Sequence, residues 1–494
     1  MFYTKENLIA LAVFVASIVT FLFWGFDYLN ENYTIFFIAT AFGIFMAFNI
    51  GGNDVANSFG TSVGAKTLTV KQALVIAAVF EISGAMLAGG EVTKTIRKGI
   101  VNLDGVTFDP MLFVFVMMGA LLAAGTWLMV ASKKGIPVST THSIIGGIVG
   151  ASLTLGAVVS APEVSPLGMV NWNKIGMIAA SWVLSPLLGG MLSYAIYWYL
   201  KKNILDPNEE KEQEIHDAKA NISDIKAQLA VENVSENDTK RLENELSVQQ
   251  KKSKKSNAFS AIRTHVPIVT AFAAAIITGM LLFKGLKKLH FDLTNIDVFL
   301  ILAIFTTLAY AFSFAIVKLM KKDSPKKATI RVFSMLQVFT ASAFAFSHGA
   351  NDIANAIGPF AAIIDVLATG EISAKAPVPT IAMFTFGVAL IVGLWFIGKN
   401  VMETVGSKLA EIFPVTGFAA ELGASAVILG ATKLGIPVSS THILIGAVLG
   451  IGILNKDANW SLMKPIATAW IITLPASGMM AAAFFMILKT VFGY

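Results

Sequence analysis

Two copies of an Asn-Asp sequence place carboxylates inside long apolar segments. The first copy reads Gly-Gly-Asn53-Asp54 and the second reads Gly-Ala-Asn351-Asp352. Each copy should interrupt a helix and expose backbone groups beside the side chains. Amide, carboxylate and carbonyl oxygens are hard ligands that suit a small hard cation. The pattern therefore indicates cation coordination by these four residues, and the alternative is that they only cap helices.

Four more polar side chains belong to the same apolar segments. Asn57 and Asn355 follow the two aspartates by three residues, which is one turn along the same helical face. They could complete a cation site or an anion site, or form hydrogen bonds between helices. Glu81 and Glu421 are flanked by small residues, so a second helix can approach closely and both should point into protein. These acids could bind a cation, carry a proton or form a structural hydrogen bond.

A second duplicated pattern places hydroxyl groups where an anion could bind. Gly135-Ile-Pro-Val-Ser-Thr-Thr-His142 and Gly435-Ile-Pro-Val-Ser-Ser-Thr-His442 each set Gly and Pro before three hydroxyls and an apolar helix. This order predicts a turn that enters a helix N-terminus, where free N–H groups favour an anion. Two facing turns would surround a tetrahedral oxyanion, and the alternative is ordinary capping. The candidate anion-binding residues are Ser139, Thr140, Thr141, Ser439, Ser440 and Thr441.

Arginine is absent from all of these motifs. An anion would therefore be held by neutral donors, by helix ends and by nearby cations. Loss of a bound cation should then weaken anion binding, which is a physical basis for symport. His142, His348 and His442 flank the motifs, and we interpret each as a core histidine rather than a proton carrier.

Composition indicates which elements must position these residues. The chain has 494 residues, of which 55% are hydrophobic and 14% are charged, whereas soluble proteins carry roughly 25% charged residues. This composition excludes several soluble domains and favours an all-α, polytopic helical membrane protein. Acids at bilayer depth are costly and usually functional. A net charge of +6 with few arginines gives no sign of nucleic-acid binding, and the absence of cysteine excludes disulfides and thiolate metal sites.

The two motif pairs also indicate that the chain is a duplicated half. The Asn-Asp copies are 298 residues apart and the Ser/Thr copies are 300 apart. The apolar block at 265–284 has no partner, and one such extra span would invert the second repeat across the membrane. Several other apolar blocks are short and interrupted by Gly, Pro or Asn, which predicts broken helices or re-entrant hairpins.

These observations predict four regions. They are an N-terminal transmembrane repeat at 1–200, a hydrophilic loop at 201–263, an extra span at 264–290 and a C-terminal transmembrane repeat at 291–494. The loop should be helical, because Ile222, Ile225 and Leu229 recur at helical spacing. Its basic flanks place it in the cytoplasm by the positive-inside rule.

The motifs as a set resemble those of the inorganic phosphate transporter (PiT) family of secondary carriers. The resemblance implies alternating-access symport of inorganic phosphate across the plasma membrane, through inverted repeats, by a homodimer without a cofactor. Phe80-Glu-Ile-Ser-Gly84 and Gly60-Thr-Ser-Val-Gly64 look like the sodium-coupled members, and Glu421 matches a glutamate important in them. Sodium ions would then be the co-substrate, served by Asn53, Asp54, Asn351, Asp352, Glu81 and Glu421. Phosphate would be bound by the six hydroxyl residues together with Asn57 and Asn355.

Three alternatives remain open on the sequence. One is a symporter with the same mechanism but another cargo, either proton-coupled metal phosphate or sulfate. Another is an intramembrane enzyme acting on phosphorylated lipid, although such an enzyme needs cationic groups to stabilise developing charge. A channel is the third, although paired broken helices with buried acids suit a closed site better than an open pore.

Inversion of the second repeat is directly testable. We expect epitope tags in equivalent loops of the two halves to label on opposite sides of the membrane in intact cells, because one unpaired span separates the repeats. Labelling of both tags from the same side would contradict the inversion.

Overall fold

The computed structural model describes residues 5–103, 108–159, 165–230, 235–254, 260–282, 293–320, 324–372, 378–398, 400–402, 404 and 411–494. Within these ranges the chain is helical, and the only extended pairing is an isolated bridge between Val101 and Val170. Twelve of the described helices are long and apolar enough to cross a membrane. The prediction of an all-α, polytopic membrane protein is confirmed.

The described helices of the two halves lie on either side of the hydrophilic segment in the sequence. The first half contains α1 (Lys5–Tyr28), α2 (Tyr33–Ile50), the π-helical turn η1 (Gly51–Val55), α3 (Ala56–Gly64), α4 (Val70–Ala88), α5 (Gly90–Lys98), α6 (Pro110–Lys133), α7 (Thr140–Val158), the 3-10 turn η2 (Pro166–Met169) and α8 (Trp172–Leu200). The second half contains α12 (Asn295–Leu319), α13 (Pro325–Asp352), α14 (Ala354–Thr369), α15 (Thr380–Ile397), α17 (Pro414–Lys433), α18 (Ser440–Asn455) and α19 (Trp460–Val491).

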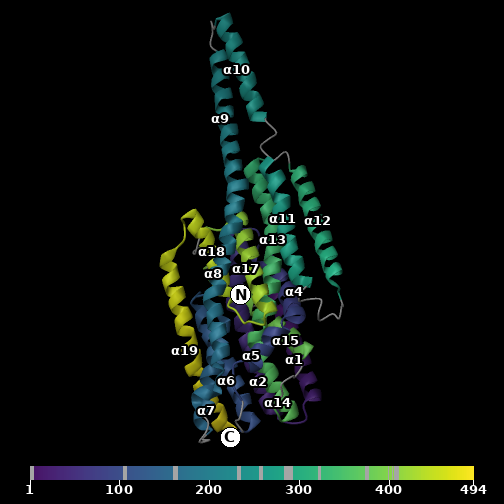
Figure 1. Ribbon diagram of the computed structural model, residues 1–494, viewed down its shortest axis with the longest axis vertical. Helices are drawn as coiled ribbons and strands as arrows, with labels where there is room; N and C mark the ends of the chain where they lie inside the picture. Colours follow the sequence, from purple (N-terminus) through teal and green to yellow (C-terminus); the bar gives the residue numbers. More distant parts are fainter. Residues whose placement is uncertain are drawn as a thin grey trace. The chain divides into compact units, whose positions relative to one another are not determined.

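The described chain divides into two compact units. The larger unit comprises Met1–Tyr194, Gly279–Asp292 and Gln337–Tyr494, and it contains both motif pairs. The smaller unit comprises Ala195–Thr278 and Leu293–Leu336. In the larger unit, α6 and α7 of the first half pack beside α19 of the second half (Figure 1).

An aromatic cluster joins the two halves in the core of the larger unit. Phe21 and Phe36 come from α1 and α2, and Phe360 and Phe386 come from α14 and α15. All four side chains are fully buried. The ring centroids of Phe21 and Phe360 are 5.7 Å apart and those of Phe360 and Phe386 are 4.8 Å apart, within the range of favourable aromatic contact. The halves therefore share one core rather than folding as separate domains.

Glycine crossings bring each half close to the other. Gly150 of α7 faces the backbone of Gly478 in α19, and Gly450 of α18 faces the backbone of Gly190 in α8. A Cβ atom added at Gly150 would lie 2.2 Å from the carbonyl oxygen of Gly478, and one at Gly450 would lie 2.3 Å from that of Gly190. Small residues at such crossings are typical of membrane helix packing.

The smaller unit contains the hydrophilic segment between the halves. It forms the π turn η3 (Lys201–Leu205) and the helices α9 (Asp206–Leu229) and α10 (Glu236–Lys254), followed by α11 (Ser260–Met280). Helices α9 and α10 pack together as a hairpin (Figure 1), with Ile225 and Leu242 buried. This segment is therefore helical, and each of its two helices buries an apolar side chain.

The glycine crossings predict a matched pair of stability effects. Gly150→Ala and Gly450→Ala should each lower the free energy of unfolding by about 1–3 kcal/mol, because the added methyl group meets backbone on the facing helix. Gly430→Ala is the control, since an added Cβ there meets nothing within 4 Å. It should leave stability unchanged or raise it slightly. Thermal unfolding in detergent measures all three, and equal effects would contradict the crossing geometry.

Candidate functional site

Each Ser/Thr motif forms a turn that enters a helix, as the sequence predicts. Gly135 and Gly435 follow the ends of α6 and α17 with φ angles of 65° and 67°, a backbone conformation that suits glycine. Ser139 and Ser439 are then the N-caps of α7 and α18. Their hydroxyl oxygens accept hydrogen bonds of 3.1 and 3.2 Å from the backbone N–H groups three residues later. The predicted turn into a helix N-terminus is therefore present in both halves.

The two motif asparagines hold these turns in place. In the first half the Asn53 amide nitrogen donates to the Ser132 hydroxyl and to the Ile136 carbonyl, at 3.0 and 3.1 Å. Its amide oxygen accepts from the backbone N–H of Val138 at 3.0 Å. Asn351 makes the corresponding three contacts with Thr432, Ile436 and Val438 in the second half.

The three contacts that each asparagine makes with its turn are called here the asparagine clamp. The clamp is a structural role that the sequence did not suggest. Asn53 and Asn351 are fully buried, and both donor hydrogens and the amide oxygen of each are engaged with the turn. One lone pair on each amide oxygen is left for any other ligand. The contacts therefore fix the Ser/Thr turn beside the aspartate that follows each asparagine.

The predicted helix break at the first Asn-Asp copy is wrong. Gly51–Val55 form a π-helical turn, and the residues on both sides keep right-handed helical dihedrals. Gly-Gly is compatible with the α and π conformations alike, so the helix widens instead of opening its backbone. In the second copy a single turn residue, Ile353, separates α13 from α14, and it also keeps right-handed helical dihedrals.

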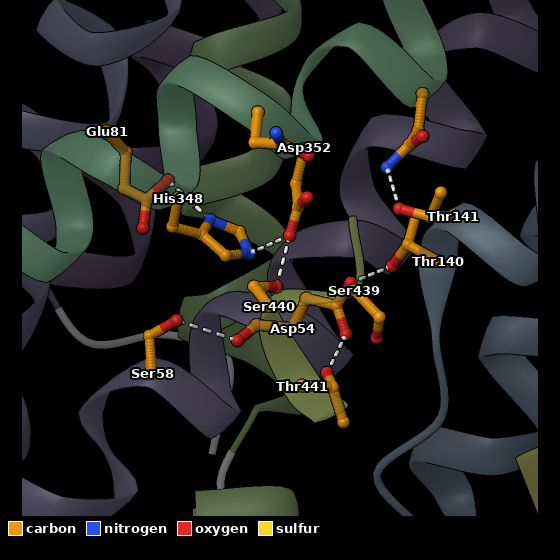
Figure 2. Close-up of polar contacts among 12 residues, drawn as sticks. Asp54, Ser58, Glu81, Thr140, Thr141, His348, Asp352, Ser439, Ser440 and Thr441 are labelled. Atoms are coloured by element: carbon orange, nitrogen blue, oxygen red, sulfur yellow. Dashed lines mark hydrogen bonds and ion pairs between the residues drawn. The ribbon is translucent and has the colours of Figure 1, made fainter. Parts of the chain in front are cut away.

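The carboxylate of Asp54 receives hydroxyl groups from both halves. Thr140 donates to Oδ2 of Asp54, and Thr441 donates to Oδ1 at 2.6 Å (Figure 2). Ser440, the counterpart of Thr140, donates to Oδ2 of Asp352. Asp54 and Asp352 are 2% and 1% exposed, so the hydroxyls replace water as their donors. The two motif types therefore meet at the aspartates.

Of the remaining residues predicted to bind an anion, Thr141 and Asn355 are described and contact each other, whereas the side chain of Asn57 is not described. Thr141 donates to the backbone carbonyl of Val438 at 2.8 Å, and Asn355 donates to the Thr141 hydroxyl at 3.3 Å. Asn355 therefore lies within the hydroxyl cluster. The side chain of Asn57 lies outside the described residues, so its predicted role stays a prediction.

His348 bridges two buried acids, a role that was not predicted from the sequence. Its Nδ1 lies 2.8 Å from Oε2 of Glu81, and its Nε2 lies 2.8 Å from Oδ2 of Asp352. All three side chains are essentially inaccessible to solvent. The close approach of Glu81 is possible because Gly349 leaves room for the α4 backbone, where an added Cβ would lie 2.1 Å from the Glu81 carbonyl oxygen. The i, i+4 spacing of His348 and Asp352 on α13 is the signal that could have found this contact.

Unpartnered oxygen atoms surround this bridge. Oε1 of Glu81 and Oδ1 of Asp352 are buried and accept no hydrogen bond within the part of the chain that the structure describes. Ligand atoms of Asp54, His348 and Asp352 lie within 4.8 Å of one another, which is compatible with one shared ion. Buried carboxylate oxygens without donors are costly unless a cation or proton joins them. The donor set therefore fits a small cation bound by carboxylates and hydroxyls.

Glu421 lies in a separate polar cluster. Its Oε1 accepts from Thr61, Ser62 and Gln337, at 2.8, 2.5 and 3.1 Å. Its Oε2 accepts from Thr340 at 2.7 Å. Glu421 is fully buried, which confirms that it points into protein. None of the hydrogen bonds found in the described residues links this cluster directly to Asp54 or Asp352.

Fixed positive charge is absent from the described surroundings of these acids. Every described hydrogen bond or ion pair to the side chains of Asp54, Asp352, Glu81 and Glu421 comes from hydroxyl, amide or imidazole groups, and none from lysine or arginine. A buried acid without a fixed cation binds a mobile one or a proton.

Comparison with known proteins gives consistent matches over most of the chain. A family model described as the phosphate transporter family matches residues 50–481. A relative from Mycobacterium bovis named "Putative phosphate permease" is 50% identical over 505 residues, covering 96% of this chain and 91% of its own length. A relative of the same name from Pyrococcus abyssi is 36% identical, covering 90% of this chain and 96% of itself. A solved structure described as "The sodium-dependent phosphate transporter" matches with a TM-score of 0.74 and 31% identity, covering 93% of this chain and all of that one.

The asparagine clamps predict a stability loss that does not depend on sodium. Asn53→Ala and Asn351→Ala should each lower the free energy of unfolding by about 2–4 kcal/mol in potassium buffer, because each leaves buried turn groups without partners. Asn49→Ala is the matched control, since Asn49 donates to the Phe45 carbonyl within its own helix. It should cost less than about 1 kcal/mol. Wild-type stability of both clamp variants in potassium, with loss only of stabilisation by sodium, would instead favour direct cation coordination.

Proposed function

This chain belongs to the phosphate transporter family, and from that premise we propose that it carries inorganic phosphate across the membrane together with sodium ions. The observation that carries the proposal is the buried contact of Asp54 with hydroxyls from both Ser/Thr motifs. This contact brings hydroxyl donors and carboxylate oxygens together, which supports one shared site for phosphate and a cation. Membership of this family also makes the protein a transporter and not an enzyme, which removes the lipid-phosphate alternative.

Coupling follows from competition for the same hydroxyl groups. Phosphate needs donors, but the hydroxyls of Thr140, Ser440 and Thr441 already donate to Asp54 or Asp352. A sodium ion bound by those carboxylates would neutralise them and release the hydroxyls toward phosphate. Phosphate and sodium would therefore bind better together than alone, and by linkage each would raise the affinity for the other.

Sodium would be bound by the carboxylates of Asp54 and Asp352, with Glu81 and Glu421 serving further ions. The free oxygens of Asp352 and Glu81 support this assignment. The matching solved structure, which is of a transporter described as sodium-dependent, supports it as well. Asn53 and Asn351 keep a supporting role through the turns, and one lone pair on each amide oxygen remains for a cation.

Transport would proceed by alternating access of two inverted repeats. Equivalent helices occur in the same order in both halves, with α11 as the additional helix between them. An inverted pair can exchange conformations and so open the same site to each side in turn. We also propose a homodimer in the plasma membrane, in line with the family resemblance.

Proton coupling is the second candidate, and the His348 bridge favours it specifically. An imidazole between Glu81 and Asp352 can hold a proton shared with either acid. A proton there would neutralise Asp352 as sodium would. The cargo would then be phosphate or metal phosphate driven by a pH gradient.

Uptake into proteoliposomes distinguishes these couplings. We expect labelled phosphate to accumulate when an inward sodium gradient is imposed in the presence of a proton ionophore. Sodium supplies the charge that the site lacks, so the uptake should survive collapse of the pH gradient. Accumulation that requires the pH gradient and ignores sodium would overturn the sodium proposal in favour of proton coupling.

Asp54→Asn and Asp352→Asn should each reduce sodium-driven uptake at least about 100-fold, because an amide keeps the shape but loses the charge. Asp109→Asn is the control, since Asp109 is an exposed N-cap of α6 and asparagine caps equally well. Its uptake should match that of the wild type. Equal uptake by all three variants would remove the aspartates from the coupling site.

A further inference from the structure

Most contacts of the site occur twice, once in each half. The asparagine clamps, the serine N-caps and the hydroxyl contacts of Thr140 with Asp54 and Ser440 with Asp352 are equivalent in both halves. Each of these contacts joins residues of the same half. They therefore tie every aspartate to the Ser/Thr turn of its own half.

The contacts that cross between the halves break this symmetry. Thr441 of the second half donates to Oδ1 of Asp54 in the first half, at 2.6 Å. Its counterpart Thr141 makes no described hydrogen bond to Asp352 and donates instead to the backbone carbonyl of Val438, at 2.8 Å. Figure 2 shows Thr441 directed at the Asp54 carboxylate and Thr141 turned elsewhere.

The acceptor that Thr141 would use is available. Oδ1 of Asp352 is buried and unpartnered in the described chain, whereas both oxygens of Asp54 accept hydroxyls. A buried carboxylate oxygen without a hydrogen-bond donor is energetically unfavourable, so a new donor would stabilise it. The same oxygen is also the best placed to receive a cation, because nothing on the described chain competes for it.

We propose that Thr141 and Thr441 are positioning residues that exchange roles during transport. In the alternate conformation, Thr141 donates to Asp352 and Thr441 turns to the carbonyl of Val138, the counterpart of Val438. The proposal rests on the alternating access described above, and it specifies which two hydrogen bonds distinguish the two conformations. One aspartate at a time therefore holds the crossing hydroxyl, and the other keeps a free oxygen for the cation.

The exchange requires each threonine hydroxyl to change its acceptor. A threonine hydroxyl moves between acceptors by rotation about χ1, and both threonines follow turns that the asparagine clamps hold fixed. The capping bonds of Ser139 and Ser439 are not involved. When the two rigid half-sites slide against each other, the hydrogen bond from Thr441 to Asp54 would break and the equivalent one from Thr141 to Asp352 would form.

An asymmetry in chemistry offers the competing explanation. His348 contacts Asp352, and its counterpart in the first half is Ile50, which has no donor. On that view His348 and Ser440 together satisfy Asp352, and Thr141 never binds it. The two explanations differ in what removal of each threonine hydroxyl does to the conformational equilibrium.

The test uses site-directed labelling of the naturally cysteine-free chain. Val63 and Ala361 are equivalent positions in the two halves, with Val63 partly exposed and Ala361 only 2% exposed. Val63→Cys and Ala361→Cys, made separately, report their environments through the rate of modification by a small methanethiosulfonate. An exchange of conformation should lower the rate at 63 and raise it at 361.

Thr441→Val should shift the equilibrium about tenfold or more away from the conformation seen here, since a hydrogen bond to a charged group is lost. The rate of modification of the cysteine at residue 63 then falls, and that of the cysteine at residue 361 rises. Thr141→Val should shift both rates in the opposite direction. The double variant should return both rates close to wild type, and Thr441→Ser, which keeps the hydroxyl, should behave as wild type.

Thr126→Val is the matched control, because the Thr126 hydroxyl donates within α6 to Leu122, and it should leave both rates unchanged. Shifts in the same direction for Thr141→Val and Thr441→Val, or none for either, would overturn the exchange. Sodium-driven phosphate uptake by the wild type is measured separately. Failure of uptake would reject the proposed function, whereas failure of opposite shifts with intact uptake rejects only the exchange.

Discussion

The structure depends on keeping carboxylates buried when no described lysine or arginine forms a hydrogen bond or ion pair with them. Asp54 and Asp352 lose almost all contact with solvent, and hydroxyl groups and one imidazole take the place of water. Hydroxyls compensate a negative charge only partly in a low-dielectric interior. Under the proposed function, the remaining charge deficit favours entry of a mobile cation and links its binding to the hydroxyls that phosphate would use.

Interleaving of the two halves is what brings these groups together. Helix α7 of the first half crosses α19, α18 of the second half crosses α8, and a shared aromatic cluster fills the core. Thr441 consequently reaches a carboxylate that lies 387 residues earlier in the chain. A change in how the halves pack would alter the site directly, without any intermediate relay.

Local features of the site could be predicted from sequence, and its long-range contacts could not. Ser139 and Ser439 were identifiable as N-caps because Gly, Pro and a hydroxyl before an apolar helix have few other interpretations. The burial of Glu81 and Glu421 followed from the small residues around them. The pairing of Thr441 with Asp54 depends on which helices meet, and periodicity within a segment carries no information about that.

One expectation from the sequence is wrong and two sets of contacts were missed, each for a physical reason. Gly-Gly at 51 and 52 suggested a broken helix, but glycine also tolerates the wider π turn that keeps the backbone hydrogen-bonded. The bridge that His348 makes between two acids was missed because its partner Glu81 lies 267 residues away in the chain. The contacts of Asn53 and Asn351 with the turns were missed because an amide oxygen suits either a cation or a backbone N–H, and only the fold shows which groups the turn presents.

The asparagine clamp also bears on the origin of the duplication. Each half contains its own aspartate, clamp, turn and capped helix, and all of these contacts close within one repeat. A single ancestral repeat would therefore have carried a complete half-site before any gene fusion. Two such chains related by a two-fold axis would have formed the whole site through the shared core and the crossing threonine contact, and the fused copies could then diverge, as His348 and Ile50 have done.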